Sequence, residues 1–300
     1  GDLKVAQGVV EWKLGNLNLA MRLLEEAVAV LRPMDERTSL ASISNNLGII
    51  HFSLKQYPEA IRSYLDGLEW LGDIENDRLR ASLFSNLAES LMRTGNWNEA
   101  EDYLQRALEI EQRTQEPHAI AYTYLNFGEL RALQGRPDEA IRYYHQALDL
   151  QLSIDAQWPA ALTRIRLAEE HLKEADTGKA LEVLAPGYEA VKELNALTLL
   201  RDYAGLYSRI YTEAGMEGRA RYYQELEEWF ISRIGQPEPA GALVRPEIGR
   251  SEGAREETSG SPRISHLWIR LATLVLLVVL IGFLMVENFR LRRTRRISSG

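Results

Sequence analysis

A spacing of forty residues recurs along most of this chain and constrains its fold more than any other feature. At one position of the repeat every unit has alanine, and at a second position every unit has a small residue. The two sets are Ala20, Ala60, Ala100, Ala140, Ala180 and Ala220, and Gly8, Gly48, Ala88, Gly128, Ala168 and Ser208. A fixed period in this range is typical of units that stack in a line and bury their apolar faces against one another. The sequence therefore predicts six repeats over residues 1–234.

Each unit reads as two helices separated by a short break. In the second unit, apolar residues recur with helical spacing from Ile43 to Leu54, and the next helix has Pro58 in its first turn, where a missing N–H is harmless. The break suits a left-handed residue at a helix end, and the first, third and fourth units have glycine there, at Gly15, Gly95 and Gly135. Lys55 and Ala175 replace that glycine in two others. No alternation of period two competes, so the predicted fold class is all-α.

The order of small, aromatic and apolar residues in each unit resembles the tetratricopeptide repeat. The period exceeds the usual one for that repeat, so the resemblance is to the long variety found in kinesin-light-chain-like and bacterial regulator-associated arrays. It covers about three quarters of the chain. It implies a right-handed superhelical solenoid whose first helices line a concave, ligand-binding side. In the sixth unit, Gln224, Glu227 and Glu228 make the last helix polar, as a capping repeat requires.

One helix of the solenoid departs from the pattern. In unit five, Pro186 and Gly187 fall inside the second helix, where proline removes a hydrogen bond and clashes with the preceding turn. We expect an interruption or kink there at a cost of about 3 kcal/mol unless packing compensates.

Charge and composition exclude several classes of function. Residues 247–300 hold nine arginines and five glutamates, which leaves 26 basic and 38 acidic side chains in the first 246 residues, a balance of −12. Such a surface disfavours nucleic acid and suits a cationic or neutral peptide. The chain has no cysteine, its five histidines are scattered, and no phosphate loop or nucleophile motif occurs. We expect neither an enzyme nor a bound cofactor or metal.

Two columns on the first helices are the candidate binding residues. One column is Asn46, Asn86, Asn126 and Arg166, and three residues later on the same helical face stand Glu89, Glu129 and Glu169. An asparagine amide offers both a donor and an acceptor to a peptide backbone, and the glutamates would then select basic side chains. The resemblance to kinesin-light-chain-like arrays implies this role for the three asparagines. The alternative is that they bond to neighbouring turns and only hold the helices together.

The C-terminal part differs in composition. Residues 235–265 are rich in Pro, Gly, Ser, Glu and Arg and read as a flexible linker, and residues 267–287 contain sixteen consecutive uncharged residues, which predicts a transmembrane helix. The tail, residues 288–300, is basic, with Arg290, Arg292, Arg293, Arg295 and Arg296. The positive end favours a cytoplasmic tail with the repeats outside, as in a bacterial inner-membrane protein. A tail-anchored protein with the opposite topology is the alternative.

Three functions are compatible with this layout. The first is a membrane-anchored scaffold that binds a protein or an extended, possibly basic, peptide in the concave groove. The second is the input part of a bacterial membrane signalling protein, such as a histidine kinase, diguanylate cyclase or transcription regulator, whose output domain lies beyond this sequence. The third is a tail-anchored adaptor. Because the sequence starts at Gly1 inside a repeat, we also expect it to be a fragment or a processed product.

Overall fold

The structure is a computed structural model that describes residues 2–234. This part of the chain folds into twelve α-helices and one 3₁₀ turn, without strands. The helices are α1 (Asp2–Lys13), α2 (Leu17–Leu31), α3 (Arg37–Ser53), α4 (Tyr57–Leu71), α5 (Asp77–Arg93), α6 (Trp97–Thr114), α7 (Pro117–Leu133), α8 (Pro137–Ser153), α9 (Gln157–Lys173), α10 (Thr177–Glu193), α11 (Leu197–Glu213) and α12 (Glu217–Arg233), and the 3₁₀ turn is η1 (Arg32–Met34). The predicted all-helical repeat solenoid is therefore confirmed over these residues.

The helices follow the period of the sequence. The first helices of successive units begin at 37, 77, 117, 157 and 197, and the second helices begin twenty residues after each of them. The break between them has a left-handed residue whether or not it is glycine: φ is +82° at Gly95, +60° at Lys55 and +58° at Ala175. The geometry of the turn is thus imposed by the packing of the two helices, and lysine and alanine accept a conformation that glycine adopts freely.

The column of small residues is where the two helices of a unit touch. A Cβ added to Gly48 would lie 2.3 Å from the ring of Tyr64, and one added to Gly128 would lie 2.4 Å from the ring of Tyr144. Both tyrosines are almost fully buried. In these two units a tyrosine from the second helix therefore fills the space that the missing side chain leaves.

Helix α10 continues through Pro186, so the predicted interruption is wrong. Proline cannot donate to the preceding turn and displaces its carbonyl groups. Arg164 of α9 donates from Nη1 to the carbonyl of Val183, three residues before the proline, at 3.1 Å. The neighbouring helix thus supplies a hydrogen bond to the turn that the proline disturbs.

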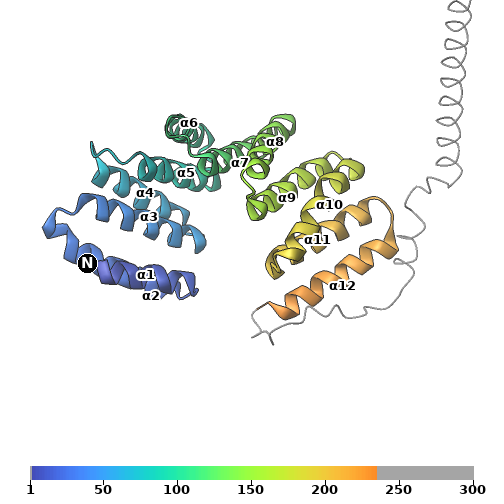
Figure 1. The fold of residues 1–300 in the computed structure, drawn as a ribbon, viewed down its shortest axis with the longest axis horizontal. Coiled ribbons are helices and arrows are strands. Elements are labelled where there is room, and N and C mark those ends of the chain that lie inside the picture. The colour runs from blue at the N-terminus through green and yellow to red at the C-terminus, as the bar shows by residue number, and fades with distance from the viewer. Residues whose placement is uncertain (1, 235–300) are drawn as a thin grey trace, which may run out of the picture.

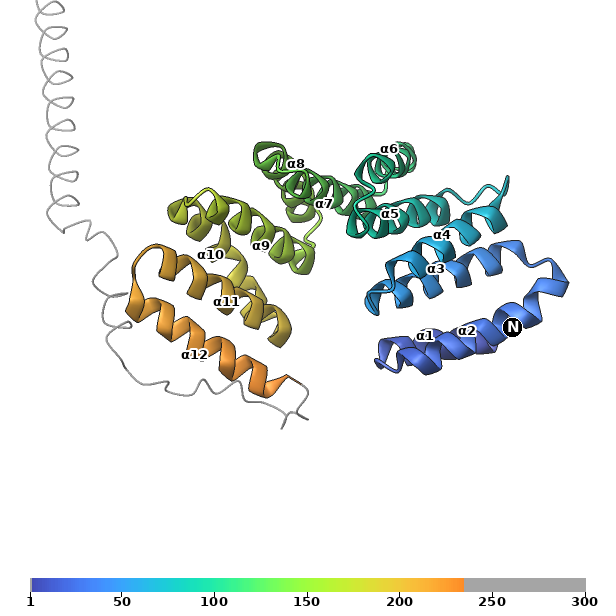
Figure 2. The same ribbon diagram turned by 180° about the vertical axis from the view of Figure 1, so that it is seen from behind.

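Figures 1 and 2 show the stacked helices as an open arch. Helices α1–α4 form one arm, α9–α12 form the other, and α5–α8 join them. The apolar core runs through the stack rather than gathering at one centre, with one cluster around Leu83 and Leu87 and another around Tyr203 and Tyr207. This continuous core leaves the inner side of the arch free for other side chains.

Within residues 2–234, no helix combines the length and the apolar composition that crossing a membrane requires. The longest, α6, has 18 residues and alternates apolar with charged side chains, because it must bury one face and expose the other. This finding overturns the predicted localisation as a single-pass membrane protein. The segments on which that prediction relied, the linker 235–265, the span 267–287 and the tail 288–300, lie outside the described residues.

Candidate functional site

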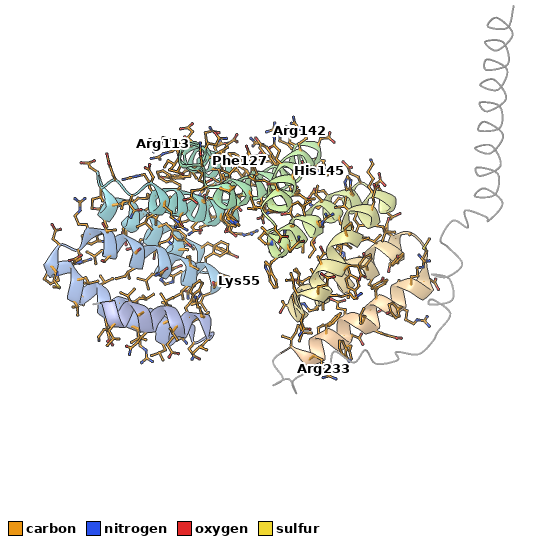
Figure 3. All side chains as sticks on the ribbon, in the orientation of Figure 1. Lys55, Arg113, Phe127, Arg142, His145 and Arg233 are labelled. Carbon is orange, nitrogen blue, oxygen red and sulfur yellow. The ribbon has the colours of Figure 1, made fainter. Side chains whose placement is uncertain are left out.

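A single cavity of about 640 Å³ opens between the first helices of four successive units, α5, α7, α9 and α11, and is closed at one end by α12. Because helices from four units reach one cavity, it lies on the inner side of the curve, and we call it the groove. Five of the seven predicted residues line it: Glu89, Asn126, Glu129, Arg166 and Glu169. By contrast, Arg142 of α8 lies on the outer edge of the arch (Figure 3).

The three asparagines of the predicted ladder have different environments. Asn46 is half-buried and does not line the groove. Asn86 donates from Nδ2 to Oδ1 of Asn45 at 2.9 Å, which is the packing role considered as the alternative. Asn126 is 2% exposed, lines the groove, and its Nδ2 has no hydrogen-bond partner in residues 2–234. Of the three, Asn126 is therefore the one that lines the groove, with a buried Nδ2 that has no partner in hydrogen-bond geometry and lies beside the Tyr122 hydroxyl.

The predicted glutamates all have arginine partners. Arg93 lies 2.8 Å from Glu129 and 3.7 Å from Glu89. Glu169 likewise has two arginine partners: Arg166 lies 3.1 Å from it and Arg209 lies 3.7 Å from it. The groove thus carries a chain of alternating charges, which sequence reasoning missed because it did not pair the glutamates with Arg93, which stands outside the two columns, or with Arg166 and Arg209 in neighbouring positions of the array.

Tyr122 links this charge network to the wall of the groove. Its hydroxyl donates to Oε2 of Glu89 at 2.8 Å, and although 40% of the side chain is exposed, protein surrounds it on most sides. Burial and the neighbouring Glu89 raise the pKa of Tyr122 well above its usual value, and the amide of Asn126 beside the hydroxyl acts in the opposite direction. Burial likewise raises the pKa of Glu89, against the effect of the Tyr122 hydrogen bond.

Arg166 remains a cation in this setting. Burial lowers its pKa, but Glu129 and Glu169 more than offset burial, so that the pKa of Arg166 lies above its usual value. The groove therefore presents fixed charges of both signs over an apolar floor that includes Leu125, Leu162 and Leu206. Such a lining suits a polar chain with apolar side groups rather than a reacting small molecule.

A second cavity, of about 190 Å³, lies between α5 and α7 and shares Tyr122 with the groove. Its lining includes Glu111, which is 3% exposed and has an Oε2 atom without a hydrogen-bond partner among the described residues. Burial raises the pKa of the Glu111 carboxyl, opposed by the hydroxyls of Thr123 and Ser85. We call this cavity the side pocket.

Sequence reasoning missed Glu111, although the repeat period contained a signal. The corresponding position in the other units is apolar or neutral: Leu31, Leu71, Gln151 and Val191. A carboxylate at a position that is buried and uncharged in these four units destabilises the folded state unless a partner or a ligand interacts with it. No group of three or more His, Asp or Glu side chains in residues 2–234 is arranged to hold a metal ion.

Comparison with known proteins gives one matching family and several solved structures with a similar fold. Residues 79–153 match the sequence profile of the family described as Tetratricopeptide repeat. Comparison with curated protein sequences gives no match.

Among solved structures, BtubC (BKLC) from P. vanneervenii has a TM-score of 0.61 and 16% identity, over 77% of this chain and 97% of that chain. A Rap protein complexed with Competence and Sporulation Factor has a TM-score of 0.55 and 17% identity, over 77% of this chain and 74% of that chain. A signal transduction ATPase with numerous domains and a tetratricopeptide repeat sensor, from Pyrococcus horikoshii, has a TM-score of 0.64 and 18% identity. That similarity covers 78% of this chain and 36% of the ATPase.

At these identities the structural similarity shows the fold alone. The fold nevertheless agrees with the family match and with the period of the sequence. Residues 79–153 carry the tetratricopeptide repeat, and the described helices form a tetratricopeptide-like solenoid.

Proposed function

We propose that the chain is a scaffold that binds an extended peptide, or an extended segment of a protein, in the groove, and that it carries no catalytic activity. The observation that carries this proposal is the groove itself, because one cavity of about 640 Å³ crosses four successive units. An extended ligand can contact every unit along such a path, whereas a compact small molecule would reach only part of it. Pockets for small molecules typically enclose their ligand, whereas the lining of this one is spread over helices of four units.

The chemistry of the lining supports the same ligand class. The free Nδ2 donor of Asn126 matches a peptide carbonyl, and the alternating charges match a chain that carries both acids and bases. Two structures with the same fold were solved with small partners: a Rap protein with Competence and Sporulation Factor, and a Rap conjugation gene regulator of the plasmid pLS20 with the Phr* peptide. Those partners belong to those proteins, and here they serve as precedents for peptide binding by the fold.

Selection from a displayed library of random linear peptides tests the proposal. The 300-residue chain should enrich a set of related peptides, and Asn126→Ala should lose their binding while its helicity stays unchanged, with urea unfolding used to check that the variant remains folded under the binding conditions. Asn98→Ala on the exposed surface of α6 is the matched control. A triple substitution of Asn46, Asn86 and Asn126 with alanine is a weaker test, because Asn86→Ala also removes the bond to Asn45.

Two results would count against the groove. One is a folded chain that enriches no peptide. The other is an Asn126→Ala variant that binds the enriched peptides as tightly as the parent chain, with Asn98→Ala unchanged.

A second candidate function is the input part of a signalling protein. It is favoured by the similarity in fold to a signal transduction ATPase whose sensor is a tetratricopeptide repeat array. The two candidates share the groove and differ in what the bound ligand controls. Sequencing the native reading frame beyond Gly300 separates them, since a catalytic or DNA-binding domain there would favour the sensor.

A further inference from the structure

The side pocket borders a buried carboxylate, Glu111, that has the hydroxyls of Thr123 and Ser85 beside it but no cation, and its Oε2 has no partner in hydrogen-bond geometry among the described residues. Glu111 forms part of its wall and is 97% buried, with Oε2 unpaired. Asn86 also lines the pocket, and since its Nδ2 is engaged by Asn45, its Oδ1 is the atom available to a donor. A carboxylate accepts and cannot donate, so the missing partner is a donor, and a positively charged one is favoured most.

The fold does not need a carboxylate at this position. In the next unit Gln151 occupies the same place, and its Oε1 accepts a hydrogen bond from Thr163 at 2.8 Å. Leucine or valine suffices at the corresponding position in three other units. Burying an unpaired carboxylate destabilises the folded state, and here it gives no structural benefit that glutamine would not give.

The surroundings of the pocket also favour a cation. The ionisable side chains that line it are Arg78, Glu111, Glu116, His118 and Tyr122. Two of these are carboxyl groups, and Arg78 is exposed at the rim, where water screens it. A water molecule occupies about 30 Å³ in the liquid, so about 190 Å³ accommodates a planar guanidinium and part of its stem.

The side pocket adjoins the groove. Tyr122 lines both cavities, so a peptide held in the groove beside Tyr122 lies next to the side pocket. Glu89, Glu129 and Glu169 in the groove are already paired with Arg93, Arg166 and Arg209, whereas Glu111 is a buried carboxylate whose Oε2 has no partner in hydrogen-bond geometry among the described residues.

We propose that the side pocket receives the arginine side chain of a peptide bound in the groove, with its guanidinium against Glu111 and Asn86. This inference rests on the proposed function and names one residue of the ligand. Arginine is preferred over lysine because its planar fork can donate to two acceptors at once, whereas the ammonium group of lysine is a compact point charge.

Ethylguanidinium tests the pocket without any peptide. It should bind the 300-residue chain in ligand-observed NMR, and ethylurea, a neutral compound of the same shape, should not. Glu111→Gln should weaken ethylguanidinium binding about tenfold or more, because a charge-assisted hydrogen bond becomes a neutral one. Glutamine already occupies this position at Gln151, so the variant should fold. Glu109→Gln, on the exposed face of the same helix, is the matched control.

Equal binding of ethylguanidinium by the parent chain and Glu111→Gln would overturn the proposal, as would no binding by the parent. A second variant, Ser82→Phe, fills the pocket from its α5 wall and should also abolish binding.

The peptide library separates this inference from the proposed function. Peptides enriched by the parent chain should share one arginine, and those enriched by Glu111→Gln should lack it. Enriched peptides without a shared arginine would overturn the inference and leave peptide binding in the groove intact. Binding of ethylguanidinium at Glu111 without capture of any peptide would instead confirm the pocket and contradict the groove.

Discussion

Two successive junctions of the solenoid place a buried polar side chain beside a buried threonine at the same backbone positions. Between α8 and α9, Thr163 donates to Gln151, and both side chains are within 2% of full burial. Between α6 and α7, Glu111 lies near Thr123, but its Oε2 has no partner and a pocket opens beside it. At the α8–α9 junction the amide of Gln151 has a hydrogen-bond partner, whereas at the α6–α7 junction the Oε2 atom of Glu111 has none among the described residues.

The difference teaches that a buried polar position in a repeat can serve either packing or binding. The third member of each junction decides which. At the α8–α9 junction the neighbour from the preceding first helix is apolar Leu125, whereas at the α6–α7 junction it is Ser85, whose hydroxyl lies 3.2 Å from that of Thr123. The junction with the polar neighbour, which we call the open junction, has the charge and the cavity, and the junction with the apolar neighbour, which we call the closed junction, has the paired amide.

Installing a carboxylate at the closed junction should have the largest effect. Gln151→Glu should lower the free energy of unfolding at pH 7 by about 3 kcal/mol, because the new charge is buried beside Leu125 without a cation. Urea unfolding followed by circular dichroism measures this. Gln146→Glu, exposed on the same helix, should change little, and an equal loss in both variants would contradict the comparison.

Removing the donor at the closed junction should have the next largest effect. Thr163→Val should lower the free energy of unfolding by about 1–2 kcal/mol, because Oε1 of Gln151 loses its partner in a dry environment. Hydrogen exchange in α8 and α9 should rise with it. Thr198→Val, at an exposed position of α11, serves as the control. Unchanged exchange would mean that the Gln151 hydrogen bond contributes nothing.

Removing the charge at the open junction should stabilise the unliganded chain. Glu111→Gln should raise the free energy of unfolding at pH 7 by about 1 kcal/mol. Because the pKa of Glu111 is raised in the folded state, the folded chain binds the proton more tightly. The stability of the parent chain should fall as the pH rises above the ordinary carboxyl value of 4.5, and the gain of the variant should vanish below it. A parent chain more stable than the variant at pH 7 would reverse the assignment.

Converting the closed junction to the apolar form should have the smallest effect. The double variant Gln151→Leu, Thr163→Val removes both polar partners together and should lie within about 1 kcal/mol of the parent. Leu31 with Ile43 and Leu71 with Leu83 are natural versions of this pair. The free energies of unfolding lost in Gln151→Leu alone and in Thr163→Val alone provide the comparison. If the loss in the double variant equals the sum of these two losses, the hydrogen bond does not couple the two residues.

The period of the sequence was sufficient to predict the helices. Their starts depend on local rules, such as proline in the first turn and a left-handed residue at the break, and on the apolar stripe of each helix. It also placed five of the seven proposed site residues on one cavity, because residues forty apart occupy the same face of successive first helices. Whether those residues bind a ligand stays a prediction.

The fate of each side chain depended on the tertiary structure. Asn86 and Asn126 occupy the same position of the repeat. The Nδ2 atom of Asn86 donates to Asn45, whereas the Nδ2 atom of Asn126 has no partner in hydrogen-bond geometry among the described residues. The partners that decide this come from neighbouring units and sit at other positions of the repeat, so the column alone does not contain them. The same holds for Arg93, which lies 2.8 Å from Glu129 and stands at another position of the repeat.

The sequence by itself thus determined that this chain is a helical repeat solenoid and which faces its helices bury. Only the tertiary structure decided that Glu111 lies unpaired beside a pocket while Gln151 is satisfied. The physical reason is the distance along the chain between the residues that interact. Helix boundaries and buried faces are set by residues a few positions apart, whereas the pairing of a buried polar atom depends on how successive units rotate and which side chains that rotation brings within 3 Å.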